Sequence, residues 1–565
     1  MKVETPVESF LVETARLPVP APERVAATEE ARDQWLRLGF WLLAVGIGAL
    51  QAWAGRYAMG PDGISYVDLA HAWLRHDWSA AVNLYWSPLY PLSLALGFLV
   101  LHPTPYWEYP VVHLVGFLLF VGALASFDFF WRTVRADRTE REALSGVPGA
   151  AGLPNWAWLT LGYTLFIWSL LNLCPVYSVT PDMGMAAFIF LASGLLLRVR
   201  RSRVRGPLFA LLGAVLGLAY LQKAMMFPLA FVFLAVGVLE VTERRHRLPL
   251  ALVGVLAFLV VAGPYIAAMR VYKGQLTFGD AGKLNYAWFV DAVPKKYWEG
   301  EVPGCGTPKH APRKLLNRPP VYEYGTPVGG TWPAWFDPTY WHEGLRISFR
   351  PRGQWQALMR GLAQYGLIFM GDWRSRPLAG FFTSLRSLVI GCLLLFWMEG
   401  RPGRVGRRIA QSWPLLAPAF CGMGMLALVL VEPRYVLGFV VMFWAVLLSA
   451  VRLPVSAPAR KLVASVTAAA VMCMAVPVAL SAVRQLKQAV VGTGPRCEDW
   501  EMVEALQRAG IHPGDKLAAI APSSYGWAQL DQLTIVADIP VSRLTEFWHA
   551  DPSVQAQAVR AFAQT

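Results

Sequence analysis

Four charged residues stand at the ends of apolar segments and could carry chemistry. The acids are Asp62, in GPDGISYVDLA, and Asp182, in SVTPDMG, and the cations are Lys223, in YLQKAMM, and Arg434, in LVEPRYVLGF. Ionisable residues at a membrane boundary are costly and often functional. Lysine and arginine can hold an anionic lipid phosphate while a carboxylate accepts a proton, so the four residues together suit proton transfer beside a bound phosphate.

Each of these residues also has a simpler interpretation. Asp62 and Asp182 each stand where a helix is expected to begin, and a carboxylate there can serve as an N-cap. Lys223 lies between two apolar segments and could extend its amine to the membrane surface. Arg434 is harder to explain in this way, because it lies on a side that otherwise lacks arginine. Asp68 fits a solvated or paired residue on a helix surface.

The motifs of common soluble enzymes are missing. The sequence contains no GxxxxGK[ST], GxGxxG, HExxH, CxxC or GxSxG. The 6 cysteines are scattered without the spacing of metal ligands. Three of them, Cys174, Cys305 and Cys497, fall in segments expected outside the cytoplasm, where an oxidising compartment would permit one disulfide.

The elements that must position these residues are membrane helices. Of 565 residues, 55% are apolar and 16% are charged, against roughly 25% charged in a soluble domain. Apolar runs recur that approach the ~20 residues of a spanning helix. We predict eleven spans, at 38–53, 109–131, 156–171, 182–197, 207–221, 225–240, 248–268, 378–397, 413–431, 435–451 and 462–483. The fold class is therefore a polytopic α-helical membrane protein.

Basic residues predict the orientation, because short cytoplasmic loops carry an excess of lysine and arginine. The loops after the second, fourth, sixth, eighth and tenth spans hold nineteen basic residues. The short loops after the third, fifth and ninth spans hold only Lys223 and Arg434. We expect a cytoplasmic N-terminus and an extracytoplasmic C-terminus in the plasma (inner) membrane. The net charge of +14 then reflects topology and contact with membrane lipids, and not nucleic acid binding.

One apolar stretch, 88–102, does not fit this count. If it crossed the membrane, every arginine-rich loop would lie outside. We expect it to be an interfacial or re-entrant helix in the outer leaflet.

The predicted organisation has three parts. Residues 1–36, rich in Glu, Pro and Ala, are expected to form a disordered cytoplasmic tail. Residues 37–483 form the transmembrane domain, with outer loops at 54–108 and 269–377. A loop of about a hundred residues is uncommon unless it has structure and a function, and an amphipathic helix is expected within it around 348–370.

The third part is an extracytoplasmic tail at 484–565. Its pattern predicts a helix at 498–509, a strand at 516–521, a strand at 534–537 and a helix at 552–563. This is a small α/β segment that stops where another strand is expected. The segment is either incomplete or docks on the membrane domain.

Four short motifs in these outer segments carry a resemblance to a known family. They are DGISY at 62–66, SPLYP at 87–91, TPD at 180–182 and EPRY at 432–435. In their order along the chain and their common side of the membrane, these motifs resemble those of the GT-C glycosyltransferases, membrane enzymes that take a sugar from a polyprenyl-phosphate donor. Over roughly residues 35–450, the chain looks most like the branch that contains the protein O-mannosyltransferases and the lipid A aminoarabinose transferases. Asp62 lacks the adjacent second acid of the mannosyltransferases and Ser87 replaces a more usual proline, so the acceptor class does not carry over.

The resemblance implies a direct, inverting transfer. Asp62 would be the general base that takes a proton from the acceptor hydroxyl. Lys223 and Arg434 would bind the donor phosphate, because a lipid phosphate leaving group needs charge stabilisation more than acid help. Asp182 would position the acceptor or a divalent cation.

A segment of the long loop adds three candidates for substrate contact. Lys283 would be a further phosphate contact, and Tyr286 and Trp288, in GKLNYAWFVDAV, would stack on sugar faces. Interfacial packing of these aromatic residues is the alternative.

The implied partners are a polyprenyl-phosphate-linked sugar donor, a glycan, lipid or protein acceptor, and membrane lipids. Two other classes of function stay open. A transporter or flippase of lipid-linked saccharides would more often place ionisable residues mid-span, and the span centres here are almost free of them. A non-catalytic membrane scaffold would leave Asp62 replaceable without loss of function.

Overall fold

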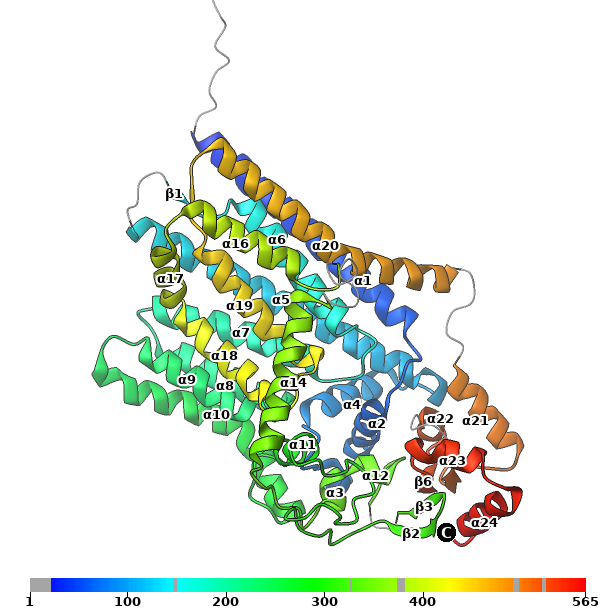
Figure 1. The fold of residues 1–565 in the computed structure, drawn as a ribbon. Helices are drawn as coiled ribbons and strands as arrows, with labels where there is room; N and C mark the ends of the chain where they lie inside the picture. Colours follow the sequence, from blue (N-terminus) through cyan, green and yellow to red (C-terminus); the bar gives the residue numbers. More distant parts are fainter. Residues whose placement is uncertain (1–21, 146–149, 325–327, 373–381, 491–496, 521–524) are drawn as a thin grey trace, which may run out of the picture.

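Figure 1 shows the computed structural model of the chain, which describes residues 22–145, 150–324, 328–372, 382–490, 497–520 and 525–565. Long helices form one large domain, and a smaller part with four strands lies at one end of it. The smaller part combines the C-terminal segment with strands from the long loop.

Every predicted span overlaps a helix, and residues 378–381 of the eighth span lie outside the described residues. These helices are α1 (Pro22–Ala54), α5 (Pro105–Ser145), α6 (Asn155–Leu173), α7 (Asp182–Arg201), α8 (Gly206–Gln222), α9 (Met226–Leu239), α10 (Arg244–Lys273), α16 (Arg386–Glu399), α18 (Trp413–Ala427), α19 (Leu437–Ala450) and α20 (Ala457–Val490). The remaining helices of this part are α2 (Pro61–Leu74), α3 (Trp78–Ala81), α4 (Leu89–Leu101), α11 (Ala281–Phe289), α12 (Pro333–Phe336), α13 (Pro338–Trp341), α14 (Pro351–Met370), α17 (Pro402–Gln411) and the 3₁₀ helix η1 (Pro433–Tyr435). β1 (Ala150–Ala151) pairs with β4 (Leu453–Pro454).

Among the described residues, 6 helical segments are long and apolar enough to cross a membrane, and they lie in α1, α5, α6, α7, α10 and α20. The other predicted spans are helices of 14 to 17 residues, shorter than the ~20 residues that cross a bilayer without help from neighbours. The protein is thus a polytopic helical membrane protein, and the count of eleven spans stays a prediction.

Helix α4 covers the apolar stretch that did not fit the span count. It has 13 residues, a length of about 20 Å at 1.5 Å per residue, against about 30 Å for the hydrocarbon core. It packs on α2 and α5 and leaves Leu96, Leu99 and Val100 exposed. Its length and exposed apolar side agree with an interfacial helix.

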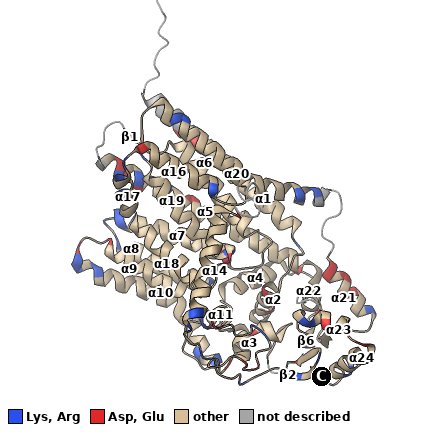
Figure 2. Ribbon diagram, viewed as in Figure 1, with Lys and Arg blue, Asp and Glu red and all other residues tan. Residues whose placement is uncertain are grey.

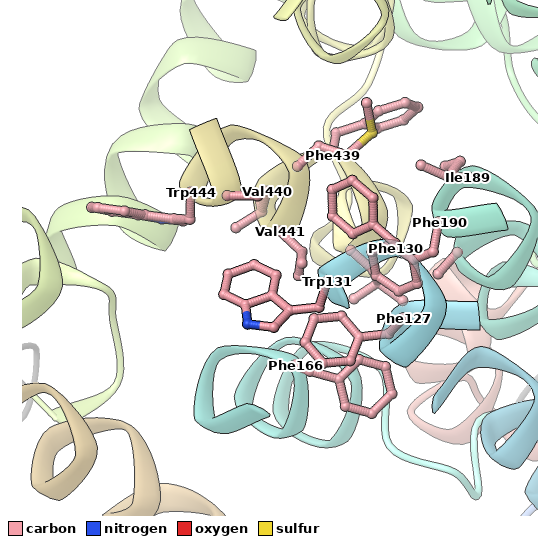
Figure 3. Packing of buried hydrophobic residues seen from close by; sticks show 14 of the residues in the cluster. Phe127, Phe130, Trp131, Phe166, Ile189, Phe190, Phe439, Val440, Val441 and Trp444 are labelled. Carbon is pink, nitrogen blue, oxygen red and sulfur yellow. The ribbon is translucent and has the colours of Figure 1, made fainter. Parts of the chain in front are cut away.

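Large aromatic side chains hold the centre of the helical domain together. Figure 3 shows Phe127 and Trp131 of α5 against Phe166 of α6. Trp131 stacks on Trp158 with ring centres 4.3 Å apart. A side chain at Gly162 would lie 2.1 Å from the Trp131 ring, so glycine is what permits this close packing of α5 and α6.

The arginine-rich loops contact one another at one end of the helices. Figure 2 shows the blue residues gathered near α17 and at the loop between α9 and α10. The contacts that join the five loops are Arg201 to Glu140 (2.6 Å), Arg200 to Glu240 (3.1 Å), Arg452 to Glu142 (3.1 Å) and Arg141 Nη1 to Ser412 Oγ (2.9 Å). The predicted common side of these loops is therefore confirmed, whereas the orientation in the membrane stays a prediction.

The C-terminal segment follows the predicted order of elements. It contains α21 (Glu498–Arg508), β5 (Lys516–Ala519), α22 (Gly526–Leu530), β6 (Thr534–Asp538), η2 (Val541–Arg543), α23 (Leu544–Trp548) and α24 (Pro552–Phe562). The missing strands come from the long loop, as β2 (Arg313–Asn317) and β3 (Pro320–Glu323). The sheet order is β2-β3-β6-β5, with β5 parallel to β6 and β3 antiparallel to it. The tail is thus completed by docking on the long loop.

Two predictions about helices have different outcomes. The amphipathic helix expected around 348–370 is confirmed as α14. The disordered tail expected over 1–36 is corrected in its second half, because α1 begins at Pro22, and Glu, Ala and Arg are good helix formers. Residues 1–21 lie outside the described residues.

Candidate functional site

The four charged residues singled out in the sequence come together at one end of the helical domain. Asp62 lies in the first turn of α2, Asp182 is the first residue of α7, Lys223 directly follows α8, and Arg434 lies in η1 just before α19. Arg201, at the other end of α7, belongs to the arginine-rich loops. The length of α7, about 30 Å by helix rise, separates the two ends.

The four side chains form a chain of alternating charge. Arg434 Nη2 donates to Asp62 Oδ2 at 3.1 Å, and Arg434 Nε lies 3.8 Å from Asp182 Oδ2. Lys223 Nζ donates to Asp182 Oδ1 and lies 3.5 Å from the centre of the Tyr435 ring. Each charge thus has an opposite neighbour, which offsets part of the cost of removing it from water.

The two carboxylates differ in exposure. The Asp62 side chain is 31% exposed and that of Asp182 is 1% exposed. Asp62 Oδ1 accepts a hydrogen bond from Trp335 Nε1 at 3.1 Å. Asp182 therefore serves to hold the two cations, and Asp62 is the carboxylate that a ligand can reach.

Helix capping does not explain either aspartate. Gly60 is the N-cap of α2 and Pro181 is the N-cap of α7, and neither helix has a side-chain capping bond. The capping interpretation of Asp62 and Asp182 is therefore wrong, although an acid in a first turn still interacts favourably with the helix dipole. Lys223 likewise does not extend freely to the surface, because it is paired with Asp182.

A cavity of about 310 Å³ opens beside this cluster. Its polar lining is Asp62, Ser87, Asp182, Gln222, Lys223, Asn285 and Arg434, its aromatic lining is Tyr66, Tyr85, Trp86, Phe278 and Tyr435, and its apolar lining includes Met425, Leu426, Val429 and Leu430. The charged residues come from helix ends, and these four apolar residues come from the last turn of α18 and the segment that follows it. The cavity can thus bind a molecule with both an anionic and a hydrocarbon part.

Trp335 belongs to the site and was not found from the sequence. It lies in α12, 273 residues along the chain from Asp62. Its ring packs against Tyr85 and Trp86, with ring centres 5.9 and 5.8 Å away, and its carbonyl accepts from Ser65 Oγ. No local pattern marks this tryptophan among the seven of the long loop.

The three long-loop candidates lie on α11 but do not line the cavity. Ala281, Gly282 and Asn285 are the residues of α11 in its lining. Lys283 is exposed and Tyr286 half-buried. Trp288 is buried against Tyr85 and Trp335, with ring centres 5.4 and 5.7 Å away, and its Nε1 donates to His342. A direct role of these three in substrate binding stays a prediction, and the contacts of Trp288 are those of packing.

A second contact fixes the long loop on α2. Asp68 accepts from the backbone N–H and the hydroxyl of Thr331, at 2.7 and 2.9 Å. Burial raises the pKa of Asp68 to about 6. The expectation of a paired residue is confirmed, and its partner is the loop that also supplies Trp335.

The cluster does not fit a divalent cation. In the part of the chain that the structure describes, no group of three or more His, Cys, Asp and Glu side chains could hold a metal ion. Asp182, the candidate for this role, already binds Lys223 and faces Arg434. A metal ion would have to displace both cations.

No family model matches the chain, and no curated protein matches it in sequence. The chain is similar to the crystal structure of ArnT from Cupriavidus metallidurans in the apo state, with 12% identity, a TM-score of 0.36, and 90% of this chain and 86% of that chain covered. It is also similar to ArnT from Cupriavidus metallidurans bound to undecaprenyl phosphate, with 13% identity, a TM-score of 0.37, and 92% and 87% covered.

Proposed function

We propose that this protein is a GT-C-like membrane glycosyltransferase that moves a sugar from a polyprenyl-phosphate donor to an acceptor hydroxyl on the extracytoplasmic side of the plasma (inner) membrane. The observation that carries the proposal is the position of Arg434 between an accessible carboxylate, Asp62, and a buried one, Asp182, in the wall of one cavity. The motifs that resemble the GT-C family contribute these same residues.

The proposed roles follow from exposure and pairing. Asp62 removes the proton of the acceptor hydroxyl as its oxygen bonds to the anomeric carbon. The bond from that carbon to the phosphate oxygen breaks, and the electron pair leaves with the polyprenyl phosphate. Arg434 has five N–H donors. Its Nη2 binds Asp62 and its Nε faces Asp182, so the donors of Nη1 can bind the phosphate. Asp182 positions Arg434 and Lys223 for this contact.

The apolar lining of the cavity supports the proposal of a donor with a prenyl chain. Met425 and Leu426 lie in the last turn of α18 and Val429 and Leu430 lie just after it, and all four line the same cavity as the charged cluster. A hydrocarbon chain bound there would place its phosphate near Arg434. The acceptor is proposed as a glycan, a lipid or a protein.

The test is an assay of the purified protein with a radiolabelled polyprenyl-phosphate sugar and a solubilised envelope fraction as the acceptor pool. We expect label on an acceptor with the wild-type protein and none with Asp62→Asn. In proteoliposomes, movement of the labelled donor between leaflets without transfer would identify a flippase instead. Neither transfer nor movement, with a partner protein retained, would identify a scaffold.

A further inference from the structure

A second cavity, of about 680 Å³, lies among the arginine-rich loops. Ser449 and Arg452, at the C-terminal end of α19, are part of its lining, whereas Arg434 precedes the first residue of α19. The two cavities are therefore at opposite ends of this helix. Six arginines line the second cavity: Arg141, Arg401, Arg404, Arg407, Arg408 and Arg452.

Three of these arginines are already neutralised. The pairs are Arg452 with Glu142 at 3.1 Å, Arg141 with Asp137 at 2.7 Å, and Arg408 with Glu399. Glu142 and Glu399 are the acids of the cavity lining, so both are occupied by these pairs.

The other three arginines carry charge that the protein does not offset. Arg401, Arg404 and Arg407 are exposed. Within the described ranges, their side chains make no ion pair or hydrogen bond. The three are spaced three residues apart along α17 and its N-cap, while Val405 on the other side of the helix is buried. Like charges at this spacing are neighbours on a helix and repel each other.

Topology alone does not account for this arrangement. An excess of arginine in cytoplasmic loops requires only that the residues be present. Here three separate segments, the C-terminal end of α5, α17 with its N-cap, and the residues after α19, direct arginines to one cavity. Met398, Leu453 and Pro454 complete its wall with apolar groups. A cavity with both arginines and apolar side chains suits a ligand that has an anionic group attached to a hydrocarbon part.

We propose that this cavity, the arginine cavity, binds the phosphate headgroup of an anionic membrane lipid. The guanidinium group presents paired N–H donors that match a phosphate. Basic pockets between membrane helices bind such headgroups. The bound phosphate supplies the negative charge that Arg401, Arg404 and Arg407 lack in the protein. The proposal does not depend on the cavity beside Asp62 and Arg434, called the donor cavity below, or on transfer activity.

The test measures lipid binding to the full-length protein in a neutral detergent by native mass spectrometry. The probe is short-chain phosphatidylglycerol, with phosphatidylcholine and inorganic pyrophosphate as comparisons. We expect saturable binding of phosphatidylglycerol, weakened at least about tenfold in the triple variant R401Q/R404Q/R407Q, since each basic residue near a lipid phosphate contributes roughly fivefold in affinity.

The matched control is R203Q/R244Q/R460Q. It removes three exposed arginines that belong to the arginine-rich loops but do not line the arginine cavity. We expect less than about a twofold change. Equal losses in both triple variants, or equal binding of phosphatidylcholine, would overturn the proposal. Binding of pyrophosphate without binding of phosphatidylglycerol would mean that the cavity takes a free phosphate and not a lipid headgroup, which would overturn the proposal. If the triple variant has a lower unfolding temperature than the control, Arg404→Gln alone replaces it, with an expected loss of roughly fivefold.

Discussion

The two aspartates of the donor cavity have the same chemistry but different surroundings, which separates their roles. Asp182 is buried and bound by Lys223, so its carboxylate holds the cluster in position. Asp62 keeps 31% of its side chain exposed and is oriented by Arg434 and Trp335. The sequence predicted that these charges share a site, because their motifs lie on one side of the membrane. It could not predict Trp335, whose approach depends on the fold of the long loop.

The first prediction concerns Asp62. Because Gly60 and not Asp62 caps α2, and because Asn can still accept the hydrogen bond from Trp335, Asp62→Asn should lower the unfolding temperature only slightly, through the loss of its charge beside Arg434 and the helix dipole. The amide cannot take up a proton, so turnover should fall at least about 100-fold. Turnover and thermal unfolding of the same preparations test this. Asp77→Asn, in the exposed cap of α3, is the control and should keep wild-type turnover. An active Asp62→Asn enzyme would move the general base elsewhere.

The second prediction separates the two cations. Arg434→Ala should weaken donor binding about tenfold or more, because a charge-assisted hydrogen bond contributes about 1.5–3 kcal/mol. Lys223→Ala should in addition lower the free energy of unfolding by about 3 kcal/mol, because it leaves the buried Asp182 without its close partner. Donor titration and denaturant unfolding distinguish these effects. Combining Lys223→Ala with Asp182→Asn should restore stability but not donor affinity; a stable single variant would contradict this account.

At the scale of elements, the local sequence pattern predicted the helix and strands of the C-terminal segment, but it did not predict which distant strand pairs with them. The predicted helix at 498–509 and strands at 516–521 and 534–537 correspond to α21, β5 and β6. The strand missing beside them is β3, more than two hundred residues earlier in the chain. A strand of four residues with an adjacent proline has no alternation long enough to be recognised.

The third prediction tests this sheet with a disulfide. Glu323 and Ala537 are opposite each other in the antiparallel pairing of β3 and β6, and such residues lie about 4.5–5.5 Å apart, within disulfide range. Glu323→Cys with Ala537→Cys, in a background with the native cysteines replaced, should therefore cross-link on oxidation. Arg313→Cys with Ala537→Cys is the control, because β2 is two strands away, at about 10 Å. Equal cross-linking of both pairs would argue against the observed register.

The fourth prediction is a pH dependence of the same sheet. Asp538 ends β6 and accepts hydrogen bonds from the hydroxyls of Tyr297, Tyr324 and Tyr525. Burial raises the pKa of Asp538 to about 6 from an ordinary value near 3.8, although the tyrosines and Lys296 oppose the shift.

Because the folded form binds this proton more tightly than the unfolded form, stability should be highest below pH 4 for this group and should fall as pH rises to about 6. The change is on the order of 2–3 kcal/mol. Hydrogen exchange of the β6 amides at pH 4 and 7.5 measures it. Asp538→Asn should reduce the dependence, whereas the exposed Asp515→Asn should not. An unaltered slope in Asp538→Asn would exclude this carboxyl as the cause.

For the whole molecule, charge divides the two ends of the helical domain. One end has paired charges around the donor cavity, and the other has the arginine cavity with three unpaired cations among the described residues. The first end would contact a lipid phosphate that enters a reaction, and the second a lipid phosphate that stays bound. Under the proposed orientation, the two leaflets would each supply one of these lipids.

The fifth prediction tests that orientation. A reporter that is active only outside the cytoplasm should work when fused after Gly304 or Thr565 and fail after Arg203 or Arg404. The reason is that the loops of Arg203 and Arg404 share one side of the protein, because Arg201 and Ser412 of these loops both contact the C-terminal end of α5. Short arginine-rich loops stay in the cytoplasm. A second reporter, active only in the cytoplasm, should give the opposite result at the same four positions. Activity of the first reporter after Arg203 would mean that α4 crosses the membrane, despite a length of about 20 Å.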